Sequence, residues 1–238
     1  MFQLRPAAER GHTRIAWLDS WHTFSFGSYF DAMFMGFSDL RVINDDVVAP
    51  ARGFGMHPHD NMEIISVVLS GGLEHTDSLG HGEILRPGEV QVMTAGSGIV
   101  HSEVNPSKTD PVHFLQIWIL TGERGLQPYY EQRSFGKEKM LNRPCLIVSG
   151  SGRDNSLPIN QDAEIFQTLL EAEKTIGFTL DKTRSYWLQI AQGAVTLNDH
   201  PLVAGDGVAI AGEQGNIAVR GIDALSNFLF FDLRAEQQ

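Results

Sequence analysis

Cysteine, basic residues and long apolar runs are all scarce in this 238-residue sequence, and each scarcity excludes a class of protein. The single cysteine, Cys145, cannot form an internal disulfide, which fits a reducing compartment. Lys and Arg number 18 against 29 Asp and Glu, which gives a formal net charge of −11. Nucleic acids and anionic membranes bind clustered Lys and Arg, so we expect neither a nucleic-acid nor a membrane partner.

No apolar stretch reaches the roughly 18 residues that a membrane-spanning helix needs. The first residues, Met1–Pro6, also lack the long apolar run of a signal peptide. These two absences lead us to expect a cytoplasmic protein. Apolar residues nevertheless make up 42% of the chain, which is enough to build a sizeable core.

Long amphipathic helices are missing too, and short strand-like runs dominate. Glycine-bearing turn signals separate these runs at intervals of about 8–12 residues, which predicts an all-β barrel or sandwich. The runs expected to be strands are Ser38–Asn44, Glu63–Leu69, Glu83–Leu85, Val90–Met93, His113–Leu120, Trp187–Ala191, Ala194–Leu197, Val208–Ala211 and Asn227–Leu233. The stretch Leu157–Glu173 fits a helix or a strand, and the sequence leaves that choice open.

A weak internal repeat divides the chain into two halves. A strand, a glycine turn and a second strand that ends in a Gly-Glu or Gly-Asp corner occur at residues 70–90 and again at 192–207. The expected boundary is the polar, glycine-bearing region Gly136–Arg143. It predicts one unit at residues 1–136 and a second at 137–238, with the turn-rich stretch 149–156 as a loop inside the second.

Two clusters of histidine and carboxylate side chains in the first half carry the chemistry. His57, His59 and Glu63 would share one face of a β-strand by simple alternation. His101 and Glu103 share a face by the same rule and follow a glycine-rich turn. Three imidazoles and a carboxylate, without thiolate, favour iron, manganese, cobalt, nickel, copper or zinc over calcium. Strand geometry alone does not decide which of the two glutamates completes the set.

Four protein ligands on an octahedral ion would leave two positions for water, dioxygen or a chelating substrate, as in a catalytic site. We interpret the histidines His75, His81 and His113 as ordinary strand or turn residues. His22 is taken as unconnected to the metal set.

These motifs resemble those of a known family. The spacing His-x-His-x3-Glu at residues 57–63, followed by Gly-x2-His-x3-Asn at 98–105, looks like the paired motifs of the cupin superfamily. The segments Trp-His-Thr-Phe-Ser-Phe-Gly at 21–27, His-Pro-His at 57–59 and Thr-Ala-Gly-Ser-Gly-Ile-Val-His-Ser-Glu at 94–103 resemble the pirin family. The likeness is closest to bacterial pirin-like proteins with quercetin 2,3-dioxygenase activity, and it is strong over residues 10–135.

The resemblance implies a bicupin fold of two β-barrels, of which the N-terminal one holds one metal ion. Carried onto this chain, the implied ligands are His57, His59, His101 and Glu103. It thereby favours Glu103 over Glu63, which is left as a hydrogen-bonding residue near the site or in the core. We expect one divalent transition metal per chain, iron(II) ahead of manganese, cobalt, nickel, copper or zinc.

The second barrel has no matching ligands, since its corresponding strand reads Tyr-Trp-Leu-Gln-Ile-Ala at residues 186–191. That departs from bicupins with two metals and indicates a packing role.

The activity that the resemblance implies is metal-dependent cleavage of quercetin, or of a related flavonol-like chelator, by dioxygen with release of carbon monoxide. Glu103 is then the candidate base. The alternative is a metal- or redox-sensing regulatory protein that binds a protein partner, because eukaryotic pirins are similar to transcription cofactors. A sugar-phosphate isomerase is a weaker third interpretation, since no Lys and Arg cluster lies near the two motifs to bind a phosphate.

Overall fold

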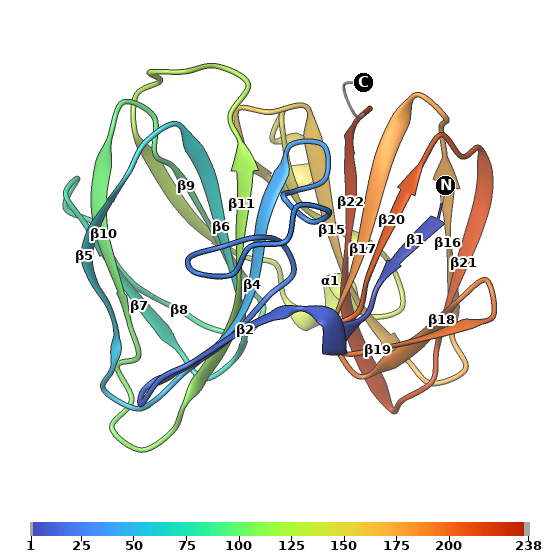
Figure 1. The fold of residues 1–238 in the computed structure, drawn as a ribbon, viewed down its shortest axis with the longest axis horizontal. Coiled ribbons are helices and arrows are strands. Elements are labelled where there is room, and N and C mark those ends of the chain that lie inside the picture. Colours follow the sequence, from blue (N-terminus) through green and yellow to red (C-terminus); the bar gives the residue numbers. More distant parts are fainter. Residues whose placement is uncertain (1, 236–238) are drawn as a thin grey trace.

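The computed structural model describes residues 2–235, and β-strands are its main secondary structure (Figure 1). The helical segments in this range are the short helix α1 (Lys137–Met140) and the 3₁₀ turns η1 (Ala7–Glu9) and η2 (Arg153–Asn155). Across the described range, none of the helices has the length and apolar character needed to span a bilayer. The all-β prediction is confirmed.

The first half of the chain builds a barrel from two sheets, one of seven strands and one of four. In sheet order the seven strands are β12 (Tyr129–Ser134), β9 (Glu89–Thr94), β6 (Met62–Ser70), β11 (Val112–Leu120), β4 (Leu40–Val48), β3 (Leu18–His22) and β2 (Gly11–Arg14). The four strands are β5 (Gly53–His59), β10 (Ile99–Val104), β7 (Leu73–Asp77) and β8 (Gly82–Leu85).

The second half repeats this construction. Its seven strands are β1 (Phe2–Arg5), β20 (Gly207–Ala211), β17 (Arg184–Gln192), β22 (Leu225–Arg234), β15 (Ala163–Glu171), β13 (Cys145–Ser149) and β14 (Leu157–Pro158). Its four strands are β16 (Thr175–Leu180), β21 (Gly215–Gly221), β18 (Ala194–Leu197) and β19 (His200–Val203).

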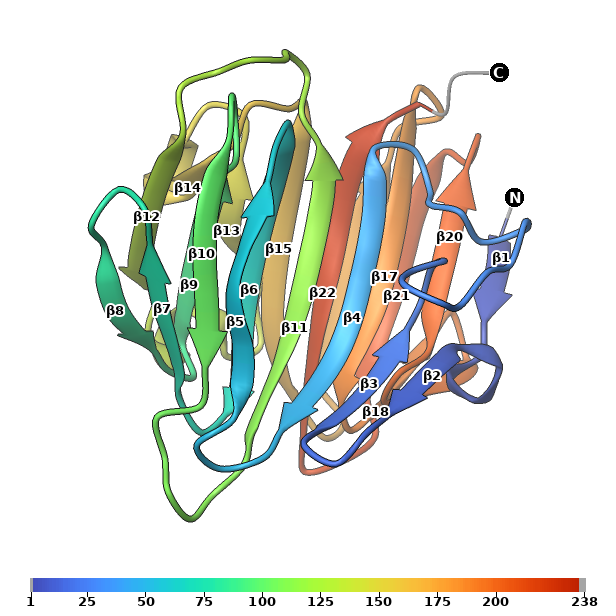
Figure 2. The same cartoon turned by 60° about the vertical axis from the view of Figure 1, so that its left-hand side comes forward.

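The two seven-stranded sheets lie against each other in the middle of the molecule, and the four-stranded sheets lie outside them (Figures 1 and 2). One hydrophobic cluster spans the contact, with Ile65 and Ile117 from the first half and Ile165 and Phe231 from the second. The central strands are therefore buried on both faces, since one face lines a barrel and the other packs between barrels. This double burial explains why they read as nearly continuous apolar runs.

The interiors of the two barrels are filled differently. The second barrel contains one continuous apolar cluster, to which β17 contributes Tyr186, Leu188 and Ile190. The first barrel has two smaller clusters, one around Phe114 and one around Met93. Polar side chains occupy the remaining interior of the first barrel, so the fold leaves room for a chemical site there.

The chain begins in the barrel that its second half builds. β1 pairs antiparallel with β20, so that Phe2 lies opposite Ile210. Arg5 at the end of β1 is 2% exposed and donates hydrogen bonds to the carbonyl of Thr23 and the hydroxyl of Tyr29. The first strand thus ties the two barrels together. The division of the chain at residues 136 and 137 stays a prediction.

The stretch that the sequence left open consists of strands, with β14 at its start and β15 over most of its length. The loop predicted inside the second half is present and contains η2.

Candidate metal centre

The three motif histidines meet inside the first barrel. β10 pairs with β5 so that His101 lies opposite His57, and His59 follows two residues along β5. The ring centres of His57 and His101 are 4.5 Å apart, and His59 is 4.8 Å from the first ring and 4.9 Å from the second. One ring nitrogen of each histidine lies within 4.8 Å of the others. Such spacing suits three ligands of one ion.

Ring nitrogens that carry no hydrogen, here called bare, are available where the three imidazoles meet. Nε2 of His101 is buried and has no hydrogen-bond partner among residues 2–235. Nδ1 of His57 lies 2.7 Å from the carbonyl oxygen of Gly55, which can only accept, so Nδ1 carries the hydrogen and Nε2 is bare. Unprotonated imidazole nitrogens are the form that binds metal, and this donor set fits a divalent transition metal.

Burial favours the uncharged form of two of the imidazoles, those of His59 and His101. Together with the neighbouring charges of His57 and His59, it lowers the pKa of His101 to about 2. Burial also lowers the pKa of His59 to about 4, with the charge of His57 adding to the effect. At neutral pH these two rings can therefore bind a metal without first losing a proton.

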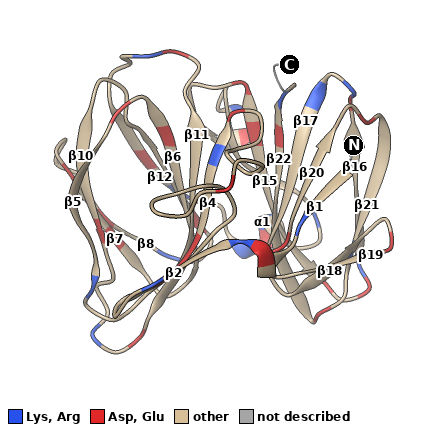
Figure 3. Cartoon of the chain, viewed as in Figure 1, with Lys and Arg blue, Asp and Glu red and all other residues tan. Residues whose placement is uncertain are grey.

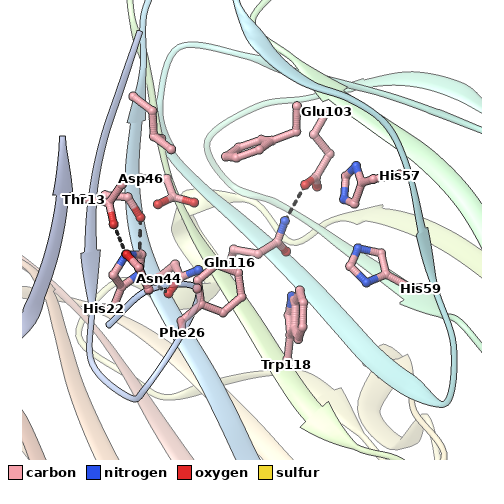
Figure 4. A pocket seen from close by; sticks show the side chains of 15 residues that line it. Thr13, His22, Phe26, Asn44, Asp46, His57, His59, Glu103, Gln116 and Trp118 are labelled. Carbon is pink, nitrogen blue, oxygen red and sulfur yellow. Dashed lines mark hydrogen bonds between the residues drawn. The ribbon is translucent and has the colours of Figure 1, made fainter. Parts of the chain in front are cut away.

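Glu103 follows His101 on β10, where the pairing with β5 shifts register between the two residues. Its carboxylate accepts a hydrogen bond from the Ser66 hydroxyl at 3.0 Å. It accepts another from the Gln116 amide at 2.5 Å (Figure 4). Burial raises the pKa of Glu103 to about 7. A carboxylate oxygen lies within 4.8 Å of ring nitrogens of His101 and His75. Glu103 therefore lies beside His101 at the edge of the histidine cluster, and its part in the ligand set stays a prediction.

Glu63 does not share a face with the cluster, and that prediction was wrong. Alternation fails because the chain turns at Asp60 and Asn61 between β5 and β6. Glu63 instead accepts hydrogen bonds from the hydroxyl of Thr94 at 2.7 Å and the amide of Asn160 at 3.2 Å. It is a hydrogen-bonding residue of the core between the two halves.

Sequence reasoning missed His75, which was interpreted as an ordinary strand residue. His75 is fully buried, and its Nδ1 lies 3.4 Å from Nδ1 of His101. Its Nε2 lies 3.1 Å from the carboxylate of Asp77. The spacing His-x-Asp on an alternating strand was the available signal, but only the pairing of β7 with β10 brings it to the site.

A cavity of about 220 Å³ opens beside the histidines (Figure 4). His57, His59 and Glu103 form one end, and Phe26 and Trp118 form an aromatic wall. Phe54 on β5, opposite Glu103, also lines the cavity. The opposite side is polar and consists of Thr13, Ser20, His22, Asn44 and Asp46. His22 therefore lines the same cavity as the metal set, contrary to our interpretation, and is hydrogen-bonded to Asn44 and Thr13.

Positions of Lys and Arg are spread over both halves and mixed with Asp and Glu (Figure 3). The absence of a nucleic-acid partner stays a prediction, in keeping with this distribution.

Two β-barrels of matching construction, with a histidine cluster inside the first, define the chain as a bicupin. The pirin family model matches residues 3–119, and the model of the quercetinase C-terminal cupin domain matches residues 146–233. The chain is 47% identical to the quercetin 2,3-dioxygenase of Escherichia coli K12, over 98% of this chain and 99% of that protein. This chain belongs to the pirin family, as its motifs indicated.

Solved structures agree with this assignment. The crystal structure of YhhW from Escherichia coli matches with a TM-score of 0.94 and 46% identity, covering 100% of both chains. A structure of the bacterial pirin YhhW in complex with nickel(II) matches with a TM-score of 0.93 and 46% identity, over 99% of this chain and 100% of that one. The bicupin prediction is confirmed.

Proposed function

We propose that this chain is a metal-dependent dioxygenase that cleaves quercetin, or a related aromatic enol able to chelate a metal, with release of carbon monoxide. One observation carries the proposal. The buried Nε2 of His101, without a partner among residues 2–235, lies where three imidazoles converge at the end of a cavity. The activity is supported by the 47% identical relative named quercetin 2,3-dioxygenase.

The proposed ligands of one divalent transition metal are His57, His59, His101 and Glu103. A divalent ion is supported by the nickel(II) complex of the Escherichia coli pirin. Iron(II) remains our first expectation for the native metal, with manganese, cobalt, nickel, copper and zinc as alternatives for this donor set. When bound, the metal supplies Lewis acidity that lowers the pKa of a coordinated hydroxyl group.

The cavity walls would hold and orient the substrate. The rings of Phe26 and Trp118 meet edge to face with centres 5.4 Å apart, and Trp118 contacts His59 in the same way at 4.9 Å. Aromatic walls favour a planar aromatic ligand. A cavity of about 220 Å³ is smaller than the roughly 300–1,000 Å³ of a typical ligand site, so it suits one small molecule and little water besides.

Glu103 is the proposed acceptor of the substrate's hydroxyl proton. Ser66 donates to its Oε1 and Gln116 to its Oε2, which fixes the position of the carboxylate. Two lone pairs remain on the carboxylate, one to bind the metal and one to accept a proton. A general base must be within hydrogen-bonding reach of that proton, and Glu103 lines the cavity on the same side as His57 and His59 (Figure 4).

The proposal is tested by purifying the protein anaerobically, measuring its metal content, and assaying quercetin loss and carbon monoxide release in air. We compare wild type with His101→Ala, and use His200→Ala, an exposed change on β19 of the second barrel, as the control. We expect about one metal per chain and turnover in wild type and the control, and loss of both in His101→Ala.

Unchanged turnover in His101→Ala would contradict the dioxygenase mechanism. Bound metal without turnover in wild type would also contradict it, and would favour the metal- or redox-sensing regulatory protein. A pull-down in both oxidation states of the metal would then identify the protein partner.

A further inference from the structure

We infer that Asp77 decides, through His75, which ring nitrogen of His101 carries the hydrogen, and thereby presents the bare Nε2 to the metal. The three side chains form a continuous hydrogen-bonded chain inside the first barrel. The inference rests on the proposed metal site, and it assigns positioning roles to two residues that are not proposed ligands.

The backbone register brings these side chains together. β7 pairs antiparallel with β10, so that Asp77 lies opposite His101 and His75 lies opposite Glu103. The alternation of both strands sends all four side chains into the barrel, where each is buried. His75 and His101 are then diagonal neighbours, within reach of each other across the strand pair.

Asp77 acts as an acceptor for every group that contacts it. Its Oδ1 accepts from the backbone N–H groups of Leu79 at 2.8 Å and His81 at 3.1 Å. Its Oδ2 lies 2.9 Å from Nδ1 of His81 and 3.1 Å from Nε2 of His75. A carboxylate has no hydrogen to give, so Nε2 of His75 carries the hydrogen of this bond.

The position of the hydrogen on His75 in turn fixes the position of the hydrogen on His101, the candidate ligand. An imidazole with its hydrogen on Nε2 offers a lone pair at Nδ1. The Nδ1 atoms of His75 and His101 are 3.4 Å apart, so His101 is the donor and carries its hydrogen on Nδ1. The amide nitrogen of Gln91, also 3.4 Å away, is a second donor to the same lone pair. Nε2 of His101 is left bare, and it is the buried atom that lacks a partner among residues 2–235.

The opposite placement of the hydrogens, on Nδ1 of His75 and Nε2 of His101, is unfavourable. It would place a hydrogen on Nε2 of His101, where the described residues offer no acceptor, and an unpaired buried donor is destabilising. It would also direct that hydrogen toward the point where His57 and His59 converge. Tyr130 stacks on the ring of His75 and fixes its orientation, with ring centres 4.5 Å apart and an angle of 19° between the ring planes.

Partners of this kind are frequent in metal sites, where the second nitrogen of a ligating histidine donates to a carboxylate or carbonyl, and their loss lowers metal affinity about 10- to 100-fold. Here an additional imidazole stands between the carboxylate and the candidate ligand. Because His75 supplies a lone pair to His101, it acts as a hydrogen-bond acceptor and not as a fifth ligand.

The test is the substitution Asp77→Asn. The two backbone N–H groups that contact Oδ1 would keep the amide oxygen of the asparagine in that place. Its NH₂ group would then face Nε2 of His75 and require a lone pair there, which moves the hydrogen of His75 to Nδ1 and that of His101 to Nε2. Glu74→Gln is the matched control, since Glu74 lies on the same strand but on its exposed face.

Long-range proton–nitrogen NMR of ¹⁵N-histidine-labelled full chain, stripped of metal, distinguishes protonated from bare ring nitrogens. We expect a bare Nε2 on His101 in wild type and in Glu74→Gln, and a protonated Nε2 in Asp77→Asn. In competition with a chromophoric chelator, Asp77→Asn is expected to bind nickel(II) about 10- to 100-fold more weakly than the other two proteins.

A protonated Nε2 on His101 in metal-free wild type overturns the inference, and this measurement does not depend on any variant folding. An unchanged His101 in Asp77→Asn overturns it as well. Neither readout involves quercetin, so a protein with the expected tautomers but no turnover would contradict only the proposed function.

Discussion

Gln116 on β11 donates a hydrogen bond to Oε2 of Glu103 on β10, across the interior of the first barrel. The seven-stranded sheet thus fixes a carboxylate that the four-stranded sheet carries. The hydroxyl of Ser66 on β6 lies 3.0 Å from Oε1 of the same carboxylate and 3.0 Å from the amide oxygen of Gln116, so its single hydrogen is shared between these two acceptors. The candidate ligand is therefore held by both sheets, and its position depends on how they pack.

Replacing Gln116 by leucine should weaken metal binding. Leucine has a similar size but leaves Oε2 of Glu103 with one donor fewer, and loss of such a partner lowers metal affinity about 10- to 100-fold. Titration of the metal-free protein with nickel(II) against a chelator measures the change. Gln127→Leu, at an exposed position before β12, is the control. An equal Kd in both variants would show that the amide does not support Glu103.

Trp118 should report metal binding by its fluorescence. Its ring centre lies 4.9 Å from that of His59, close enough for an open-shell ion at the histidines to quench its emission. We expect nickel(II) to quench the fluorescence of wild type and to lose most of this effect in Trp118→Phe. Trp187→Phe is the control, because Trp187 packs against Phe24 and Phe37 between the barrels. Full quenching in Trp118→Phe would place the ion elsewhere.

Asp46 should make the metal-free protein less stable as the pH rises. Burial raises its pKa from 3.8 to about 7, with the hydrogen bond from Ser20 opposing the effect. The folded protein thus keeps a proton that the unfolded chain has lost, and the stability this gives disappears as the pH rises through 7. Asp46→Asn should match wild type near pH 4 and exceed its free energy of unfolding near pH 8, by on the order of 4 kcal/mol.

The neighbouring Asp45 should stabilise the folded protein at high pH, the opposite of Asp46, so Asp45→Asn is the control. Burial alone would raise its pKa, but the hydrogen bond from His113 and the charge of Arg10 outweigh burial and lower it. Its contribution to stability is therefore present above the ordinary pKa and lost as the pH falls through the lowered one. Urea unfolding near pH 8 compares the two substitutions: Asp45→Asn should be less stable than wild type and Asp46→Asn more stable. Differences from wild type of the same sign would refute the account.

Arg5 should stabilise the contact between the barrels. Its guanidinium lies 3.8 Å from the ring centre of Phe34, in addition to its bonds with Thr23 and Tyr29. Arg5→Met keeps an apolar stem but leaves a buried carbonyl unpaired, which costs about 1–3 kcal/mol. Chemical unfolding should show this loss, and Arg14→Met, an exposed change on β2, should show little. Equal stability of the two variants would contradict a role for Arg5.

The sequence was sufficient to bring much of the candidate site together because the candidate ligands form two local pairs. Alternation within one strand puts His57 beside His59 and His101 beside Glu103, whatever the neighbouring strands are. It could not show that β7 pairs with β10, because the period of two fixes a face but not a partner strand. The role of His75, 26 residues before His101, depends on that pairing.

The other differences between the sequence-based expectations and the structure have similar causes. The expected face of Glu63 was wrong because alternation does not continue through the turn at Asp60 and Asn61. β15 resisted assignment because a strand that is buried on one face and half-buried with apolar residues on the other loses the simple alternation of apolar and polar residues. The pairing of β1 with β20 joins segments at opposite ends of the chain, and no local pattern predicts such a contact.

The most direct test of the central claim is the anomalous difference density of crystals loaded with nickel(II). The account predicts one strong peak per chain, within bonding distance of ring nitrogens of His57, His59 and His101 and of the carboxylate of Glu103. His75 should remain a hydrogen-bond partner of His101 and stay outside bonding distance. No peak at the histidines, or a peak bound through His75 in place of His57 and His59, would contradict the account.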